Sequence, residues 1–385
     1  MTVDVYLTPD QLALRAEVRA YLDDAWPPDR VAAMERDEEY PDDFYRACAE
    51  RGWTALPVAE EYGGRGGSVV DLCVLVEEVG KTSISLATLY ITGTIFGSHA
   101  LEICGSPAQR ERYLPAVVSG RARFALAMSE PGAGSDFAGM AATATRLDGG
   151  RWRLEGRKGP ISGAERAEVI ICAARTSTGE RSRRAGISLF LVDAGTPGLG
   201  FERRRFPAMR GLMVDDVLLD GVEVGDDAVL GGEGEGWMNL ARLMDPERLA
   251  NAAQAVGVGQ AAVDLAVAYA KEREQYGGPI GRFQAVAHPL AESHAELAAA
   301  RLLVYAAAHK RDVEGPCPVE ASMAKTFANN AAMRAAERAL QTAGAAGYEA
   351  ESPFMRRFLE AKGCELGGGT SQIQRNIISH HLGLR

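Results

Sequence analysis

The sequence lacks the signatures of several classes of protein. Its six cysteines are scattered and none belongs to a Cys-x-x-Cys pair, a pattern typical of reduced thiols and not of a disulfide framework or a zinc site. The formal net charge is −10, so there is no surplus of basic residues for nucleic acid or for an anionic membrane surface. We therefore expect no metal site, no nucleic-acid partner and no membrane partner.

Signals for membrane insertion and export are also missing. No uninterrupted apolar run approaches the ~20 residues that a membrane-spanning helix needs. Residues Met1 to Tyr6 have neither the basic region nor the apolar region of a secretory signal. We expect a cytoplasmic protein.

Nucleotide-binding motifs are absent in their usual forms. A phosphate loop ending in Gly80-Lys-Thr82 needs a glycine at the position of Leu75, and a dinucleotide fingerprint starting at Gly132 needs one at the position of Phe137. The stretch Gly257-Val-Gly259 lies in a predicted helix and does not follow a strand, so we interpret it as helix packing. Any flavin or nucleotide is therefore expected to bind through another arrangement.

The chain does contain three segments of different periodicity. A length of 385 residues predicts two or three domains. Residues 1–120 and 231–385 show helical patterns, the second rich in alanine, whereas residues 121–230 alternate as strands do. We predict a mainly α fold with a central small β domain. It consists of an N-terminal α-helical domain (1–120), a middle β domain (121–230) and a C-terminal four-helix bundle (231–385).

Local signals refine this prediction. In the first segment we expect helices that end at Gly52, Gly80 and Gly105, the last of them running from 85 to 103. In the middle segment, Asp148-Gly-Gly150 is a strong hairpin signal, and buried strands are expected at 169–175 and 187–192. Because no helix separates these strands, we expect an antiparallel sheet or a small barrel.

Three short stretches could carry chemistry. The turn Ser129 to Asp136 can lay its backbone against a flat or phosphorylated ligand, although Pro-Gly-x-Gly is also an ordinary loop. Asp245-Pro-Glu-Arg248 resembles a helix start with Asp245 as N-cap, where Glu247 alone is an ordinary first-turn acid. The run Gly367 to Gly369 is either a flexible joint or a binding loop.

Taken together, these motifs and their order resemble the acyl-CoA dehydrogenase family over essentially the whole chain. The resemblance implies an enzyme that uses non-covalently bound FAD to desaturate an acyl thioester, such as an acyl-CoA. It also implies electron transfer to an electron-transfer flavoprotein or an equivalent acceptor. The stretches that carry the resemblance are Tyr62-Gly-Gly64; Ser129-Glu-Pro-Gly-Ala-Gly-Ser-Asp136; Gly156-Arg-Lys158 with Ile161-Ser162; Arg273-Glu-Gln-Tyr-Gly277; Phe283-Gln284; Gln341 with Gly344 and Gly347-Tyr348; and Gly369-Thr-Ser-Gln-Ile-Gln-Arg375.

The resemblance further implies residue roles. The substrate is expected to meet Ser135, Asp245, Arg248 and the backbone N–H of Gly368. The pyrophosphate and adenine of FAD are expected to reach a neighbouring subunit, which favours a homo-oligomer, either a dimer or a tetramer. The implied cofactor contacts are Leu126, Met128, Ser129, Gly134, Ser135, Pro160, Ile161 and Ser162 on the isoalloxazine side, and Arg273, Tyr276, Gln284, Gln341, Gly344, Ala345, Thr370 and Gln372 toward the other end.

The chain departs from the usual family pattern at the catalytic base. Most relatives carry the catalytic glutamate where this chain has Gly368, and a glycine cannot accept a proton. A minority, resembling the isovaleryl and long-chain enzymes, places the base at the position of Glu247. We therefore predict that Glu247 takes the α-proton while flavin N5 takes the β-hydride.

Two smaller departures are Tyr276 in place of phenylalanine and Pro160 in place of the tryptophan that usually covers the flavin. Pro160 leaves open an oxidase, in which oxygen reaches the reduced flavin. An enzyme acting on a carrier-protein thioester in biosynthesis is a second alternative, and a non-catalytic partner subunit is a third. The identity of the acyl group also stays open.

Overall fold

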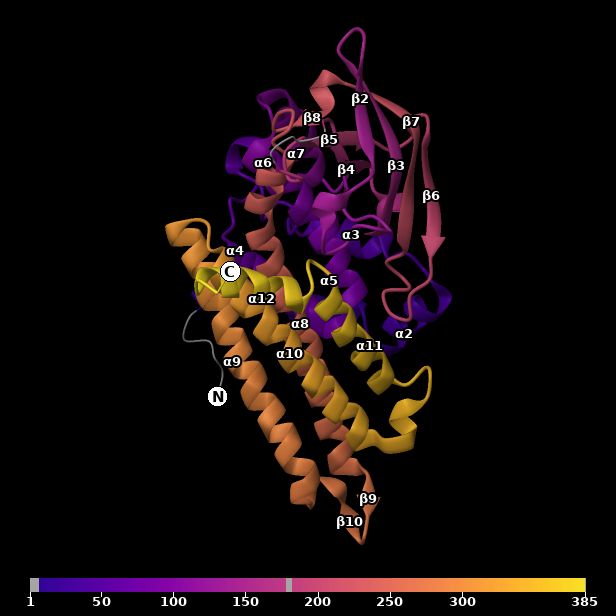
Figure 1. Cartoon of the computed structure of the whole chain (residues 1–385). Helices are drawn as coiled ribbons and strands as arrows, with labels where there is room; N and C mark the ends of the chain where they lie inside the picture. The colour runs from indigo at the N-terminus through magenta and orange to yellow at the C-terminus, as the bar shows by residue number, and fades with distance from the viewer. Residues whose placement is uncertain (1–6, 178–181, 385) are drawn as a thin grey trace.

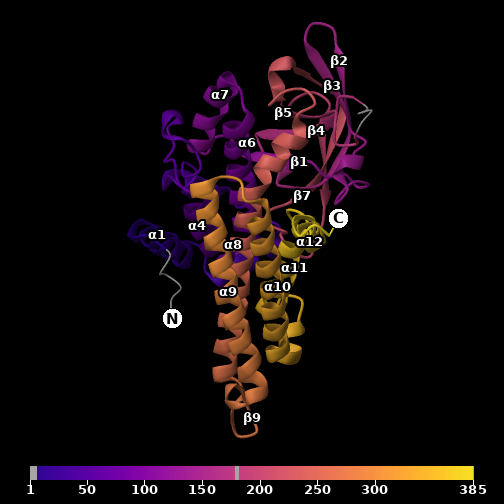
Figure 2. The same ribbon diagram turned by 60° about the vertical axis from the view of Figure 1, so that its left-hand side comes forward.

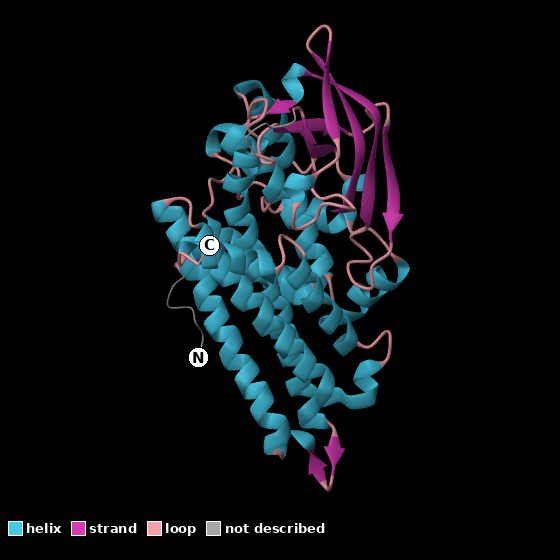
Figure 3. Ribbon diagram, viewed as in Figure 1, coloured by secondary structure: helices cyan, strands magenta, loops and turns pink. Residues whose placement is uncertain are grey.

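The computed structural model describes residues 7–177 and 182–384 and shows two helical parts joined to a twisted sheet (Figure 1 and Figure 3). Three helices of the first part begin with capping boxes, in which a Ser or Thr and the side chain three residues later satisfy each other's backbone N–H groups. The helices are α1 (Pro9–Ala25), α2 (Pro28–Asp37), α3 (Asp42–Glu50), α4 (Val69–Thr82), α5 (Ile84–Tyr90), α6 (Gly97–Cys104) and α7 (Pro107–Val118).

The segment between α5 and α6 differs from the prediction of one regular helix over 85–103. A π-helical segment, Ile91–Phe96, joins α5 to α6. By length and composition the combined stretch Ile84–Cys104 could cross a membrane, although polar residues interrupt its apolar ones. However, 89% of the 18-residue window that qualifies is buried inside the protein, as is typical of a core helix.

Close helix packing explains two of the glycines. The prediction that α4 ends at Gly80 is wrong, because the helix continues to Thr82. A Cβ on Gly80 would lie 2.7 Å from the carbonyl oxygen of Gln254, and one on Gly257 would overlap the carbonyl of Glu77. Helices α4 and α8 therefore touch backbone to backbone, which confirms the packing interpretation of the Gly257 motif.

The middle segment forms one mixed sheet. Its strands lie in the order β6-β7-β3-β2-β4-β5-β8, and β1 pairs with β4. The predicted hairpin is confirmed as β2 and β3. The expected antiparallel pairing is confirmed for most neighbouring strands. It fails where β4 pairs in parallel with β1 and with β2, and the described strands do not close into a barrel. The strands are β1 (Phe124–Ala127), β2 (Thr143–Leu147), β3 (Arg151–Ser162), β4 (Val169–Arg175), β5 (Ile187–Asp193), β6 (Leu199–Arg204), β7 (Val214–Gly225) and β8 (Val229–Leu230).

The last part is a bundle built around α8 (Gly236–Glu272). Figure 2 shows this helix running from the sheet to the small β9–β10 hairpin at the opposite end of the molecule. The helix start predicted at Asp245 is wrong, because Asp245 and Pro246 lie inside this 37-residue helix. Where one domain ends and the next begins stays a prediction. The remaining elements are β9 (Glu274–Gln275), β10 (Gly278–Pro279), α9 (Gln284–Glu314), α10 (Pro318–Ala343), α11 (Pro353–Leu366) and α12 (Ser371–His381).

Candidate active site

Glu247 is a buried carboxylate in the interior of α8. Its residue surface is 4% exposed, and its Oε2 atom has no hydrogen-bond partner. Burial raises the pKa of Glu247, while the positive charges of Lys325 and Arg248 oppose that shift. Glu247 is not the first-turn acid that the sequence suggested, because α8 begins eleven residues earlier at Gly236. The N-terminus of α8 therefore does not lie beside this carboxylate.

Gly368 lies directly against this carboxylate. Its φ is +60°, and a Cβ built on it would overlap Oε1 of Glu247 and lie 2.8 Å from Cδ and 3.0 Å from Oε2. The Glu247 carboxylate therefore fills the space in which a side chain at position 368 would begin. The family resemblance named Glu247 and Gly368 as alternative places for the catalytic base. These two positions are adjacent in space although they lie 121 positions apart in the chain.

Asp245 and Arg248 sit on either side of Glu247 along α8. Asp245 accepts hydrogen bonds from Arg248 (3.0 Å) and from the backbone N–H of Cys317 (2.9 Å). Burial raises the pKa of Asp245, and Arg248 counters this. The bond to Cys317 ties α8 to the start of α10. Nε of Arg248 is buried without a partner, so a donor remains available beside Glu247.

The glycine turn after β1 is fixed by a buried ion pair that the sequence analysis did not single out. Lys158 on β3 is fully buried and donates to Glu130 (2.8 Å) and to the carbonyl of Met128 (3.3 Å). Burial alone would raise the pKa of Glu130, but the N–H of Ala141 and Lys158 outweigh it and lower that pKa. Glu130 and Lys158 both lie within stretches that carry the family resemblance, and this was the signal in the sequence that could have identified them.

The two segments predicted to hold the isoalloxazine ring lie side by side. Gly159 donates to the carbonyl of Ser129 (2.9 Å), which joins the turn to the Pro160–Ser162 end of β3. Ile161 is buried, Ser162 is half-buried and Pro160 is exposed. Leu126 and Met128 pack in the same apolar cluster as Leu240 and Leu243 of α8. The ring side therefore shares an apolar cluster with the part of α8 that precedes Glu247.

The outer face of the turn is open. A Cβ on Gly132 or Gly134 would meet nothing within 4 Å, and Ser135 is exposed. Beside the turn, the rings of Phe137 and Trp237 stack with centroids 4.6 Å apart. A planar or extended ligand can therefore approach this backbone without displacing side chains at the two glycines.

The remaining implied cofactor residues fall into two further groups. Thr370 caps α12, where its side chain accepts from the N–H of Ile373 (3.4 Å), and Gln372 is exposed beside it. The other group lies at the far end of the bundle, where Tyr269 on α8 approaches the carbonyl of Ala343 (3.5 Å). The structure does not bring this far group to the sheet. Its members, all exposed, are Arg273, Tyr276, Gln284, Gln341, Gly344 and Ala345.

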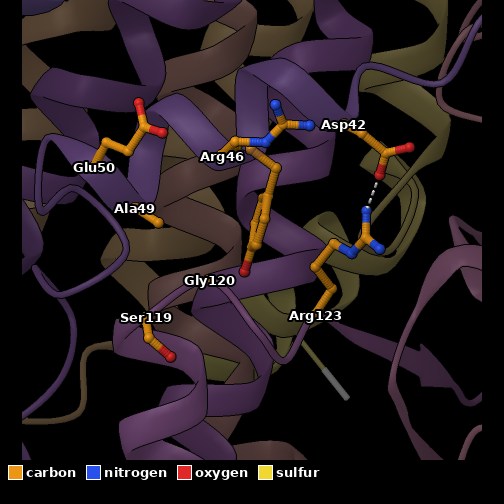
Figure 4. A pocket seen from close by; sticks show the side chains of 8 residues that line it. Asp42, Arg46, Ala49, Glu50, Ser119, Gly120 and Arg123 are labelled. Carbon is orange, nitrogen blue, oxygen red and sulfur yellow. Dashed lines mark hydrogen bonds and ion pairs between the residues drawn. The ribbon is translucent and has the colours of Figure 1, made fainter.

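A separate cavity of about 580 Å³ lies between α3 and the segment that follows α7 (Figure 4). It contains none of the predicted site residues. Arg123 points into it but is paired with Asp42 and with Glu168 (2.8 Å). The charge of Arg123 is therefore already neutralised by these two carboxylates. The lining residues are Asp42, Tyr45, Arg46, Ala49, Glu50, Ser119, Gly120 and Arg123.

The site thus combines an open glycine turn on a sheet with a buried carboxylate on α8 that has an oxygen without a hydrogen-bond partner. This combination is expected of a flavoenzyme that removes a proton from its substrate. Comparison with known proteins agrees. The protein-family models for the N-terminal, middle and C-terminal domains of acyl-CoA dehydrogenase match residues 8–121, 125–222 and 234–383, respectively. The chain belongs to the acyl-CoA dehydrogenase family, and it is therefore an FAD-dependent oxidoreductase.

Individual relatives match over nearly their whole length. The chain is 35% identical to 3-(aryl)acrylate reductase of Clostridium sporogenes, over 91% of this chain and 92% of that protein. It is 34% identical to an acyl-CoA dehydrogenase of Bacillus subtilis, over 98% of this chain and 99% of that protein. The solved structure of butyryl-CoA dehydrogenase from Megasphaera elsdenii superposes with a TM-score of 0.94 at 30% identity, over 98% of this chain and 99% of that one.

Proposed function

We propose that this protein catalyses the α,β-dehydrogenation of an acyl thioester, such as acyl-CoA to trans-2-enoyl-CoA, with Glu247 as the base. The observation that carries the proposal is the Glu247 carboxylate, buried with a free oxygen in the space beside Gly368. Among acids of this kind, one with a raised pKa is the stronger base once it is ionised.

The reaction requires two further elements. A proton next to a thioester is a very weak acid, so the developing enolate needs hydrogen-bond donors at its oxygen. The backbone N–H of Gly368 is the donor that we assign to the enolate oxygen, and Ser135, Asp245 and Arg248 are the positions that we assign to the rest of the substrate. FAD, when bound, supplies the hydride acceptor on the other side of the carbon chain.

The FAD site is proposed to be shared between subunits. From Glu247 to Arg273, α8 covers roughly 39 Å at about 1.5 Å per residue, and Figure 1 places the β9–β10 hairpin at the opposite end from the sheet. Tyr276 is 90% exposed in the single chain. Residues from both ends can hold one FAD only if the far end belongs to a second copy, which makes the protein a homo-oligomer, either a dimer or a tetramer.

A complementation experiment checks the shared site. Arg273→Ala should lose FAD, because it removes the cation nearest the implied pyrophosphate position, whereas Glu247→Gln should keep FAD but lose turnover. Co-expression of the two variants is expected to restore a fraction of the activity, because some sites then combine an intact base with an intact far end. Activity no higher than that of either variant alone would show that each chain completes its own site.

The reaction itself is tested by adding a panel of acyl thioesters to the anaerobic holoenzyme and measuring bleaching of the flavin. At least one CoA or carrier-protein thioester is expected to bleach it, and the best of them identifies the acyl group. If none does, the proposed chemistry is wrong. A purified chain that takes up no FAD would favour the non-catalytic subunit instead.

The electron acceptor needs its own measurement because Pro160 is exposed next to the ring position. We propose an electron-transfer flavoprotein or an equivalent acceptor, in a cytoplasmic enzyme of fatty acid or lipid metabolism. Reduction of an artificial acceptor should therefore exceed oxygen uptake with peroxide release. The reverse result identifies an oxidase.

A further inference from the structure

Lys325 lies at the centre of the proposed site although no part of the sequence analysis pointed to it. It is fully buried on the alanine-rich face of α10. Its Nζ donates to the carbonyl of Gly367 (2.6 Å) and to the carbonyl of Gly369 (2.8 Å). A single ammonium group therefore binds the two carbonyls on either side of Gly368.

Charged and titratable groups face Lys325 from two neighbouring helices. Glu247 and Arg248 face it from α8, and Cys364 faces it from α11. Burial lowers the pKa of Lys325 to about 8, and Glu247 opposes that shift. Among the described residues, Nζ of Lys325 forms no ion pair with the Glu247 carboxylate at 4 Å or less. The charge of Lys325 therefore acts on the carboxylate without occupying its free oxygen.

We propose that Lys325 is a positioning residue for this reaction, which orients the N–H of Gly368 and supplies the positive charge that keeps Glu247 ionised while it is buried. The inference rests on the proposed function, because it assigns Glu247 as the base. It adds a residue on a third element of the bundle to the site.

The orientation follows from peptide geometry. In a trans peptide the C=O and the N–H point in opposite directions, and the carbonyl of Gly367 belongs to the same peptide unit as the N–H of Gly368. By binding that carbonyl, Lys325 turns the N–H of Gly368 away from α10. Three consecutive glycines have much conformational freedom, so this anchor, together with Gln374 bound to the carbonyl of Gly369 (2.9 Å), defines the direction of the donor.

The charge effect follows from burial. A carboxylate without water or hydrogen-bond donors favours its neutral form, and a neutral Glu247 cannot accept a proton. The charge of Lys325 is the largest influence that lowers the pKa of Glu247, ahead of Arg248. Removing the lysine is therefore expected to raise the pKa of Glu247 further.

The test uses Lys325→Met and Lys325→Gln in the holoenzyme. In both, the acid limb of kcat/KM should move up by about one pH unit, the lower end of the usual effect of one nearby charge. In Lys325→Met, kcat should fall at least tenfold with little change in KM. Lys325→Gln, which keeps a hydrogen-bond donor, should retain more of kcat at high pH.

A second readout does not depend on turnover. Infrared pH-difference spectra of the substrate-free holoenzyme should contain a carboxylic acid band that Glu247→Gln removes, and its midpoint should rise in both lysine variants. Asn329→Leu is the matched control, because Asn329 is also buried on α10 and donates to the carbonyl of Cys364 (3.1 Å) without carrying charge. It should lower thermal stability and leave the acid limb in place.

An unchanged acid limb and an unchanged infrared midpoint in Lys325→Gln would overturn the inference and leave Lys325 a purely structural residue. If Lys325→Met accumulates only as apoprotein, Lys325→Gln still gives that answer. Normal turnover of Glu247→Gln would instead refute the base assignment, and the infrared midpoint would still report whether Lys325 controls the carboxylate.

Discussion

Glu247→Gln is expected to keep bound FAD but to slow substrate-dependent flavin bleaching by about 10³-fold, the range typical of losing a positioned general base. Glutamine has nearly the same volume as glutamate, so the contact with Gly368 remains while the proton acceptor is lost. The measurement is anaerobic stopped-flow absorbance, with the visible flavin spectrum as the check on FAD content.

The control is Glu77→Gln, which alters a buried carboxylate on α4 that is paired with Arg301 (2.7 Å) and lies outside the proposed site. It should bleach at nearly the wild-type rate even if it is less stable. Bleaching at that rate in Glu247→Gln would show that another group takes the proton.

The pH dependence of the wild-type enzyme follows from the same carboxylate. Because burial raises the pKa of Glu247 above its usual range near 4.5, the base becomes protonated as the pH falls through this raised value. The acid limb of kcat/KM should therefore lie above pH 4.5, and it should be absent from the residual activity of Glu247→Gln.

Features encoded close together in the chain were the ones that could be predicted. The hairpin around Asp148-Gly-Gly150 and the strands predicted at 169–175 and 187–192 follow from local turn chemistry and from buried apolar runs. The course of α8 could not be predicted, because an aspartate followed by a proline is typical of a helix start. In the structure Asp245 instead accepts a hydrogen bond from the backbone N–H of Cys317, 72 residues away. The parallel pairing of β1 with β4 is long-range in the same way.

The site shows the same division. Resemblance to a family selected Glu247 and Gly368, but their contact became visible only in three dimensions. Lys325 left no local signal, since one lysine on a helix is usually solvated. Its role depends on two carbonyls more than 40 residues further along the chain. Charges brought together by the packing of α8, α10 and α11 are beyond what local patterns can indicate.

Gly368→Ala is expected to reduce the bleaching rate by at least 10²-fold, because the new Cβ occupies the position of the Glu247 carboxylate and displaces it. The substitution also places a side chain at φ +60°, which costs about 1–2 kcal/mol of stability. Gly221→Ala on β7 separates the two effects. Its φ is +66°, and its Cβ would meet nothing within 4 Å, so it should lose stability and keep its bleaching rate.

Exchanging the two positions tests the contact from the other direction. Gly368→Glu alone should be as slow as Gly368→Ala, and Glu247→Ala alone should lack the base. The double variant Glu247→Ala/Gly368→Glu removes the obstructing carboxylate and returns one to the same space from the opposite chain segment. Glutamine at 247 would not serve, because it fills the volume that the new side chain needs.

We therefore expect the double variant to bleach at least tenfold faster than either single variant, a non-additive result that residues in direct contact produce. Lys325 should still hold the carbonyls of Gly367 and Gly369, so the relocated carboxylate would lie beside the same cation. If Gly368→Ala behaves like Gly221→Ala and the double variant is no faster than the single ones, the carboxylate of Glu247 does not act from the space beside Gly368.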